Sequence, residues 1–336
     1  MRAHPWAGAG PALLAAGALA ALSLLALAAP GRVAASATTV PTPPASARVA
    51  AIVATSVGLR ALPAHLVPPL AQAFGDEAVP LVDGCFDSFK DSVVHPCNYG
   101  DLAGKQTVVL YGDSHAMMWF PALEQIAVDH GWHLVALAKA TCPPVQVPVF
   151  SPDLGHWYRQ CARWKRAALA RIRALHPGLV VVGASREYGV PNDHVLVYGV
   201  RWIAGLVRTV RLLRADGAAV VVLGPVPYPT GVVSDCLAVH RHDVGACDVP
   251  DQVVAGVEGY NAAGVAGETA AVHAAGAAYL DVSPWFCARG ACAVVVGDRL
   301  VYRDDNHLTA TYAGWLAAAL AAELSQLASG FFHAAA

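Results

Sequence analysis

The chain has 336 residues, of which 56% are hydrophobic and 14% are charged, and its formal net charge is -2. An average soluble protein carries roughly 25% charged residues, so this chain is unusually apolar, and its charge balance gives no support to a nucleic-acid-binding class. The length allows one large domain or two small ones.

The first 37 residues are typical of an export segment. Arg2 precedes an apolar run over residues 7–29 that contains no acidic residue. Such a run predicts either a cleaved signal peptide or a single-pass membrane anchor. Ala35-Ser36-Ala37 offers a cleavage site, but the run is longer than a usual signal core, so both alternatives stay open. Either one places the rest of the chain outside the cytoplasm.

Residues 38–82 are rich in proline, alanine and small polar residues, with helical periodicity only near residues 49–59. We interpret this stretch as a linker. It would lead into a domain covering residues 83–327, followed by a short tail, 328–336.

From residue 107 onward, short apolar runs rich in β-branched residues alternate with longer helix-compatible segments. The predicted strands are 107–111, 132–137, 179–182, 218–223 and 277–281. The predicted helices are 116–130, 156–175, 196–215, 252–275 and 309–327, with a possible hairpin over 293–302. This alternation indicates an α/β layer fold with a mainly parallel sheet of about five strands. Ligands of such sheets bind beyond the carboxyl ends of the strands.

Eight cysteines fall into four close pairs along the chain: Cys85/Cys97, Cys142/Cys161, Cys236/Cys247 and Cys287/Cys292. In an exported chain this pattern predicts disulfides, and we expect each cysteine to pair with its neighbour and to close a short loop, although sequence alone does not fix the connectivity. Zinc binding is the competing interpretation. No pair has Cys-x-x-Cys spacing and no histidine pair completes a site, so no metal is expected.

The first predicted strand ends abruptly in Gly112-Asp113-Ser114-His115, directly before a helix. A serine at such a junction lies at the carboxyl end of a strand, beside backbone amides that are unpaired at the start of a helix. Ser114 is therefore a candidate nucleophile. The alternative is that Asp113 or Ser114 only caps the helix, and that Asp113 shapes the turn.

A serine nucleophile needs a base and a group that orients the base. His307 precedes the last predicted helix, and Asp304 lies three residues before it, so one loop could supply both groups. The competing interpretation is that residues 304–306 merely form a turn before the helix.

Together these motifs resemble the SGNH (GDSL-type) hydrolases. The resemblance is strongest to the SGNH domain attached to the carboxyl end of acyltransferase-3 membrane proteins, which O-acetylate cell-surface glycans. It covers roughly residues 83–325 and includes the stretches at 97–101, 112–115, 119–123, 142–144 and 302–308. It implies a flavodoxin-like three-layer α/β/α sandwich, with Ser114 as nucleophile, His307 as base and Asp304 as its partner, and no cofactor.

The resemblance also implies an oxyanion hole formed by the Ser114 amide, a glycine amide and an asparagine side chain. The chain departs from this pattern. Lys139-Ala140-Thr141 stands where the glycine is expected, and Gly183-Ala184-Ser185-Arg186 contains no asparagine. Gly183, Ser185, Arg186 and His115 are candidate substitutes or substrate-binding residues. Arg186 could instead pair with Glu187 or Asp193.

The sequence and its resemblance favour an exported serine acyltransferase that acts on O-acyl groups of a surface polysaccharide or cell-wall glycan. Because the chain lacks the membrane helices of acyltransferase-3, a separate membrane partner of that type would supply the acyl group. The alternatives are an esterase that removes the same groups, and a non-catalytic glycan-binding module.

Overall fold

The computed structural model describes residues 45–333, apart from residues 96, 152, 187–197 and 251–261. One compact unit spans Pro43–Ala336. The apolar run at residues 7–29, for which the sequence leaves signal peptide and anchor open, lies outside the described residues. Within the described ranges, no helix is both long enough and apolar enough to cross a membrane.

A six-stranded sheet lies at the centre of the unit, in the order β1-β3-β2-β6-β7-β9. Its strands are β1 (Asn98–Gly100), β2 (Thr107–Gly112), β3 (His133–Ala138), β6 (Leu179–Gly183), β7 (Ala219–Leu223) and β9 (Ala278–Leu280). The last five are parallel and match the five predicted strands to within one residue at each end. β1 was not predicted. It is a three-residue antiparallel edge strand without an apolar run, paired to β3.

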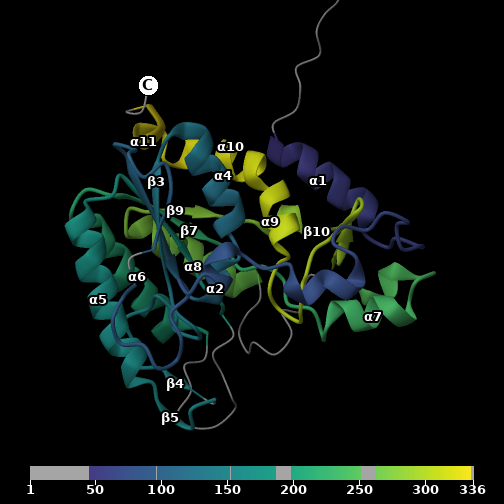
Figure 1. Cartoon of the computed structure of the whole chain (residues 1–336), viewed down its shortest axis with the longest axis horizontal. Helices are drawn as coiled ribbons and strands as arrows, with labels where there is room; N and C mark the ends of the chain where they lie inside the picture. Colours follow the sequence, from purple (N-terminus) through teal and green to yellow (C-terminus); the bar gives the residue numbers. More distant parts are fainter. Residues whose placement is uncertain (1–44, 96, 152, 187–197, 251–261, 334–336) are drawn as a thin grey trace, which may run out of the picture. The chain divides into compact units, whose positions relative to one another are not determined.

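Helices cover both faces of the sheet and make three layers (Figure 1). The apolar cluster on one face includes residues of α1 (Ala45–Ser56), α4 (Phe120–His130) and α10 (Ala317–Leu327). The cluster on the other face includes residues of α5 (Arg159–Leu175), α6 (Val200–Arg214) and α8 (Ala262–Ala274). Alternate β2 residues fall in the two clusters, as the strand pleat requires, so the sheet is buried on both sides. The predicted three-layer α/β/α class is confirmed.

Two predicted helices are interrupted. The segment after the serine forms α3 (Ser114–Met117) and then α4, with Pro121 in the first turn of α4 where its missing N–H costs nothing. The last predicted helix forms α9 (Ala310–Trp315) and α10. The first ten residues of the helix predicted over 252–275 lie outside the described residues.

The stretch interpreted as a linker packs on the domain over the part that is described, which corrects the prediction. It contains α1, the 3-10 helix η1 (Leu70–Gly75) and α2 (Val79–Val82). Val49 and Val53 lie four residues apart, on one side of α1, and both belong to the first apolar cluster. The proline- and alanine-rich composition concealed this short apolar stripe. Residues 45–82 are therefore part of the folded unit.

The tail is also ordered up to His333. It forms α11 (Ser329–His333), in which Phe331 is 7% exposed and contacts Trp132 with ring centroids 4.8 Å apart. Phe332 also contacts Trp132 and His130, and such aromatic contacts outside any periodic segment could not be predicted from the pattern of the chain.

Short elements occupy the loops at the carboxyl edge of the sheet and beside it. The segment 224–248, predicted as an irregular loop, contains α7 (Val233–Val239) and η2 (Val244–Cys247), and η3 (Ser283–Trp285) follows β9. The predicted hairpin forms β12 (Val295–Val296) and β13 (Arg299–Leu300). The remaining short strands are β4 (Phe150–Ser151) with β5 (His156–Trp157), and β8 (Val249–Pro250), β10 (Cys287–Ala288) and β11 (Ala291–Cys292).

All four predicted neighbour pairs of cysteines are joined by disulfides. The paired cysteines are 5 to 19 residues apart in sequence, so each bond closes a short loop. A bond of this kind stabilises the fold by about 2–3 kcal/mol, mainly by restricting the unfolded chain.

The Cys142–Cys161 disulfide, paired as predicted, also joins two parts of the core. Cys161 lies in the first turn of α5, and both cysteines are 0% exposed and belong to the second apolar cluster. The bond therefore fastens the segment after β3 to α5 inside the core. The alternation of the chain could not show this, since Cys161 falls at the start of a helix with little apolar character.

Candidate active site

Ser114 is the first residue of α3 and directly follows the turn at the carboxyl end of β2. Two glycines make this turn possible. A Cβ atom on Gly112 would lie 1.9 Å from the Gly183 carbonyl oxygen, and one on Gly183 would lie 2.8 Å from the Ala116 Cα. The ends of β2 and β6 and the start of α3 therefore meet more closely than any larger residue allows. Gly183, a candidate oxyanion residue, has a clear packing role here.

Asp113 is fully buried and fixes the backbone around the serine. Its carboxylate accepts hydrogen bonds from the amide of His115 at 2.8 Å and from the amide of Ser185 at 3.0 Å. The predicted turn-shaping role of Asp113 agrees with these contacts. The amide of Ser114 itself has no recorded partner among the described residues and is open to a negatively charged oxygen.

Asp304 and His307 lie on one loop, between the β12–β13 hairpin and α9. The Oδ2 atom of Asp304 accepts a hydrogen bond from the His307 Nδ1 atom at 2.8 Å. Its Oδ1 atom accepts from the amides of Asn306 and His307, at 2.9 and 2.6 Å. The His307 Nε2 atom is buried and has no hydrogen-bond partner among the described residues. The imidazole is thus oriented through one nitrogen, which leaves the other nitrogen able to accept a proton.

The ionisation of Asp304 follows from these contacts. Burial acts to raise the pKa of Asp304, but the hydrogen bond and charge of His307 and two backbone amides outweigh it and lower the pKa to about 2. Asp304 is therefore a carboxylate at neutral pH, and it stabilises positive charge on His307.

His115 connects the serine turn to the loop that carries His307. Its ring lies between the rings of His307 and Tyr228, with centroid distances of 5.1 and 5.2 Å. Burial lowers the pKa of His115 well below its ordinary value, and the nearby His307 lowers it further. A neutral His115 ring does not repel the positive charge that His307 carries when it is protonated. The structure thus brings Ser114, His115, Asp304 and His307 into one region.

Arg303 supports the Asp304–His307 loop through contacts that the sequence did not predict. Its Nη1 atom bonds to the Glu77 carboxylate at 2.9 Å and to the Phe74 carbonyl at 3.1 Å, while its Nε atom lies 3.6 Å from the Asp304 Oδ2 atom. Asp76 accepts a hydrogen bond from the amide of Thr311, in the first turn of α9, at 3.0 Å. The segment before residue 83 therefore holds both ends of this loop.

The side chain of Arg186, a candidate oxyanion donor, is engaged in contacts within the protein. Arg186 is 1% exposed and pairs with the buried Glu268. Its remaining donors bond to the carbonyls of Ala184 and Leu223, and its guanidinium lies over the Trp202 ring. The proposed surface partners, Glu187 and Asp193, lie outside the described residues. Sequence could not identify Glu268, which lies 82 residues further along the chain.

Ser185, another candidate oxyanion or substrate-binding residue, makes hydrogen bonds within the protein. Its amide bonds to Asp113, and its hydroxyl lies 2.7 Å from the Tyr228 hydroxyl. These contacts join the ends of β6 and β7 behind the serine turn. Ser185 therefore supports the turn, and Tyr228 is a residue of this region that no sequence motif singles out.

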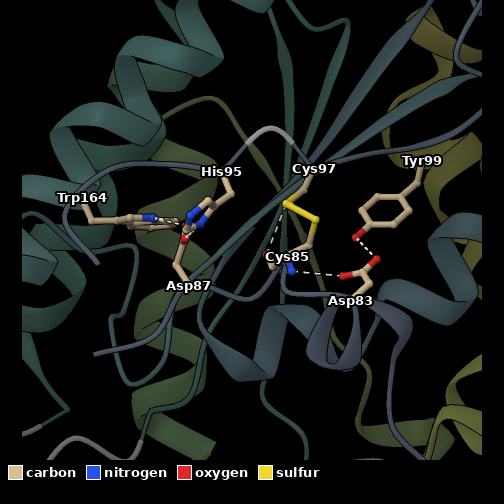
Figure 2. The surroundings of a disulfide bond; sticks show 7 residues. All are labelled: Asp83, Cys85, Asp87, His95, Cys97, Tyr99 and Trp164. Atoms are coloured by element: carbon tan, nitrogen blue, oxygen red, sulfur yellow. Dashed lines mark hydrogen bonds and ion pairs between the residues drawn. A yellow bond between two sulfur atoms is a disulfide. The ribbon is translucent and has the colours of Figure 1, made fainter. Parts of the chain in front are cut away.

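A second histidine–aspartate contact lies at the end of β3, beside the Cys85–Cys97 disulfide (Figure 2). Asp87 is 3% exposed and accepts hydrogen bonds from His95 and from the Trp164 indole, the latter at 2.5 Å. The backbone of Asp87 forms a parallel β-bridge with that of Lys139, so the segment that precedes β1 extends the edge of the sheet. These hydrogen bonds satisfy the buried carboxylate and hold the segment that precedes β1 against α5.

Lys139 occupies the strand end where the resemblance leads one to expect a glycine. Its side chain is buried and bonds to the Ser88 carbonyl, and its backbone amide bonds to the Gly112 carbonyl at 3.2 Å. Burial lowers the pKa of Lys139 to about 8, although Asp91 and Asp87 act in the opposite direction. The departure from the expected glycine thus has a structural function.

The family model described as the SGNH domain fused to AT3 domains matches residues 84–322. No curated protein matches the chain. Among solved structures, the periplasmic domain of a lipopolysaccharide acetyltransferase from Salmonella ser. Paratyphi A is similar, with 18% sequence identity and a TM-score of 0.47. That match covers 64% of this chain and 82% of the Salmonella chain.

Proposed function

Because the chain belongs to the family of SGNH domains fused to AT3 domains, and is thus an SGNH-type hydrolase or acyltransferase, we propose that it transfers O-acyl groups through a covalent intermediate on Ser114. The observation that carries the proposal is the state of His307. Asp304 holds its Nδ1 atom at 2.8 Å, and its Nε2 atom is buried without a partner in the described chain.

In the first step, the Ser114 Oγ atom attacks the carbonyl carbon of an O-acyl group, and its proton passes to the His307 Nε2 atom. Asp304 stabilises the imidazolium that forms. The tetrahedral intermediate then collapses, the carbon–oxygen bond to the departing alcohol breaks, and His307 returns the proton to that alcohol. The acyl group is left as an ester of Ser114.

In the second step, His307 removes a proton from an incoming hydroxyl, which attacks the acyl-serine ester. A sugar hydroxyl gives a new O-acyl group, and water gives a free acid. The Ser114 amide, which has no other recorded partner in the described chain, stabilises the oxyanion in both steps. Since Arg186 and Ser185 are engaged in other contacts, we assign this oxyanion hole one donor, the Ser114 amide.

We infer that the acyl group is acetyl and that the acceptor is a surface polysaccharide or cell-wall glycan. The family, whose members are fused to AT3 domains, supports this assignment. The four disulfides support an oxidising, extracytoplasmic location, with the chain either secreted or held by a single amino-terminal anchor. A separate acyltransferase-3-type membrane protein would deliver the acyl group.

The proposal is tested by measuring release of acetate from an activated acetyl ester by purified protein, in detergent because of the apolar run at residues 7–29. We expect Ser114→Ala and His307→Ala each to lower kcat by at least about 10³-fold, with unchanged thermal unfolding. Activity of Ser114→Ala equal to that of the wild type would exclude a serine acyl-enzyme.

The second candidate is an esterase that passes the acyl group only to water. The small number of oxyanion donors does not distinguish it from a transferase, since both reactions share the acyl-serine intermediate. Adding a glycan acceptor to the same assay separates them: acetylated sugar supports transfer, and free acetate alone supports the esterase. A glycan-binding module without catalysis would show no Ser114-dependent turnover at all.

A further inference from the structure

The two helices that follow β3 and β6 carry an unusual concentration of positive charge. α5 has five exposed arginines: Arg159, Arg163, Arg166, Arg171 and Arg173. α6 has four more: Arg201, Arg208, Arg211 and Arg214. Neither helix contains an acidic residue. The two helices pack side by side on one face of the sheet (Figure 1), and we call these nine side chains the α5–α6 basic face.

Most of this charge is not neutralised by the protein. Within the described ranges, Asp216 is the one carboxylate paired with any of the nine arginines, at 3.1 Å from Arg173. Four arginines bond only to uncharged oxygens, as Arg163 does to the Ser92 hydroxyl and Arg208 to the Gln146 carbonyl. The described residues supply no recorded partner to the other four: Arg159, Arg171, Arg201 and Arg211. Their guanidinium groups are therefore available to a ligand.

The basic face stands out against the rest of the chain. The whole chain has 22 lysines and arginines against 24 acidic residues, so nine arginines on two helices leave the remainder with a clear negative excess. Like charges at this density repel one another and slightly destabilise the helices that carry them. An anionic partner removes that repulsion.

The face extends from the active-site edge of the sheet to the opposite edge. α5 connects the parallel strands β3 and β6, so its first turn lies at the carboxyl edge, where Ser114 also lies. The 17 residues of α5 then run about 25 Å toward the other edge. Between the helices is a cleft of about 270 Å³ lined by Arg166, Arg173, Asp216, Gln146 and apolar side chains. This extended shape suits a polymer better than a small ion.

Two sources could supply anionic groups outside the cytoplasm: an acidic polymer or a lipid surface. α1, the first described helix, packs with α10 on the other face of the sheet from α5 and α6. The described chain therefore begins on the face that lacks the arginines. Arginine forms paired hydrogen bonds with both carboxylates and phosphates, and the length of α5, about 25 Å, matches a chain that carries several such groups.

We propose that the α5–α6 basic face binds an anionic glycan, one that bears carboxylate or phosphate groups, and leads it to the Ser114 edge of the sheet. The binding itself does not depend on catalysis. The statement that the bound glycan is the acyl acceptor or donor rests on the proposed function.

The test compares two triple variants of the full chain that lose the same charge. Arg171→Gln/Arg201→Gln/Arg211→Gln removes three arginines of the face that have no recorded partner. Arg48→Gln/Arg60→Gln/Arg241→Gln removes three exposed cations elsewhere. Binding to polygalacturonate, an acidic glycan, is measured for each in detergent, with neutral dextran as the reference polymer. We expect Kd for polygalacturonate to rise at least about tenfold in the first variant and less than twofold in the second, and to rise with salt.

Equal affinity of both variants for polygalacturonate would overturn the proposal, as would equal binding of dextran. Binding to vesicles that contain phosphatidylglycerol tests the lipid alternative. If the first variant lost vesicle binding while its affinity for polygalacturonate stayed unchanged, the face would be assigned to lipid. The binding assays are repeated with Ser114→Ala, where the same result is expected. In that way a failure of the catalytic proposal, seen as absent ester turnover, is distinguished from a failure of the binding proposal.

Discussion

At the residue scale, Asp304 carries the most specific chemistry, because one carboxylate orients His307 and receives two backbone amides. Asp304→Asn removes the negative charge while keeping the size of the side chain. We expect kcat for an activated acetyl ester to fall by about 10²- to 10⁴-fold, since the imidazolium loses its counter-charge and the ring loses its orientation. KM should change less than about threefold. A kcat close to that of the wild type would show that His307 acts without Asp304.

The same carboxylate predicts a pH dependence of stability. The folded-state pKa of Asp304 is lowered from 3.8 to about 2, so its contribution of about 2 kcal/mol is fully present above pH 4 and is lost as the pH falls toward 2. Urea unfolding of wild type and Asp304→Asn between pH 5 and pH 2 measures how the contribution of Asp304 to stability changes with pH. The difference in free energy of unfolding should shrink toward low pH, and a constant difference would contradict the assignment.

Arg186 and Glu268 form a fully buried ion pair, with side chains 1% and 0% exposed. Tyr198 donates a further hydrogen bond to Glu268 at 2.6 Å. We expect Arg186→Met to lower the free energy of unfolding by about 3–5 kcal/mol, because it leaves a buried carboxylate without its cation. The double variant Arg186→Met/Glu268→Leu should regain at least half of the loss. We expect the activity per folded molecule to be unchanged in the single and the double variant. A large fall in kcat would instead support a role of Arg186 as an oxyanion donor.

At the scale of secondary-structure elements, the segment containing η1 and α2 supports the loop of the proposed base through the Glu77–Arg303 ion pair, 2.9 Å long. Glu77→Gln should lower kcat about fivefold, because a loosened Arg303 allows the Asp304–His307 loop to shift, while KM for a small ester stays within about twofold. Asp298→Asn is the matched control, since it breaks the exposed pair with Arg299 on the neighbouring hairpin. Equal effects of the two substitutions would mean that Glu77 has no specific role.

The elements that sequence predicted well share a simple local signal. The five parallel strands are continuous apolar runs buried on both sides, and Gly112-Asp113-Ser114 marks an abrupt change from strand to helix. Asp304 and His307 lie three residues apart, so their hydrogen bond is a local contact. Each of these features can be seen within one short window of the chain.

The features that sequence missed depend on distant residues or on short elements. Glu268 pairs with Arg186 across 82 residues, and Glu77 pairs with Arg303 across 226. β1 has three residues and no apolar pattern, so only its partner β3 makes it a strand. The net charge of -2 provided no indication of a basic face, because a sum over the chain does not show where charges gather.

At the scale of the whole molecule, the folded unit is larger than the segment that matches the family. The family model begins at residue 84, whereas the compact unit begins at Pro43. Several residues from the intervening stretch belong to the main apolar cluster: Val49, Val53, Leu66, Ala73 and Ala78. The Asp304–His307 loop and this stretch therefore belong to one folded unit.

Two truncations test this boundary. Removing residues 1–42 keeps the compact unit, so its free energy of unfolding should match that of the full chain. Removing residues 1–82 keeps every residue matched by the family model but deletes three large buried side chains, each worth about 1.5–3 kcal/mol, from a domain whose total stability is on the order of 5–15 kcal/mol. We expect the shorter protein to aggregate or to lose cooperative unfolding, measured by urea titration and circular dichroism. If it unfolds cooperatively with unchanged stability, residues 45–82 are dispensable for the fold.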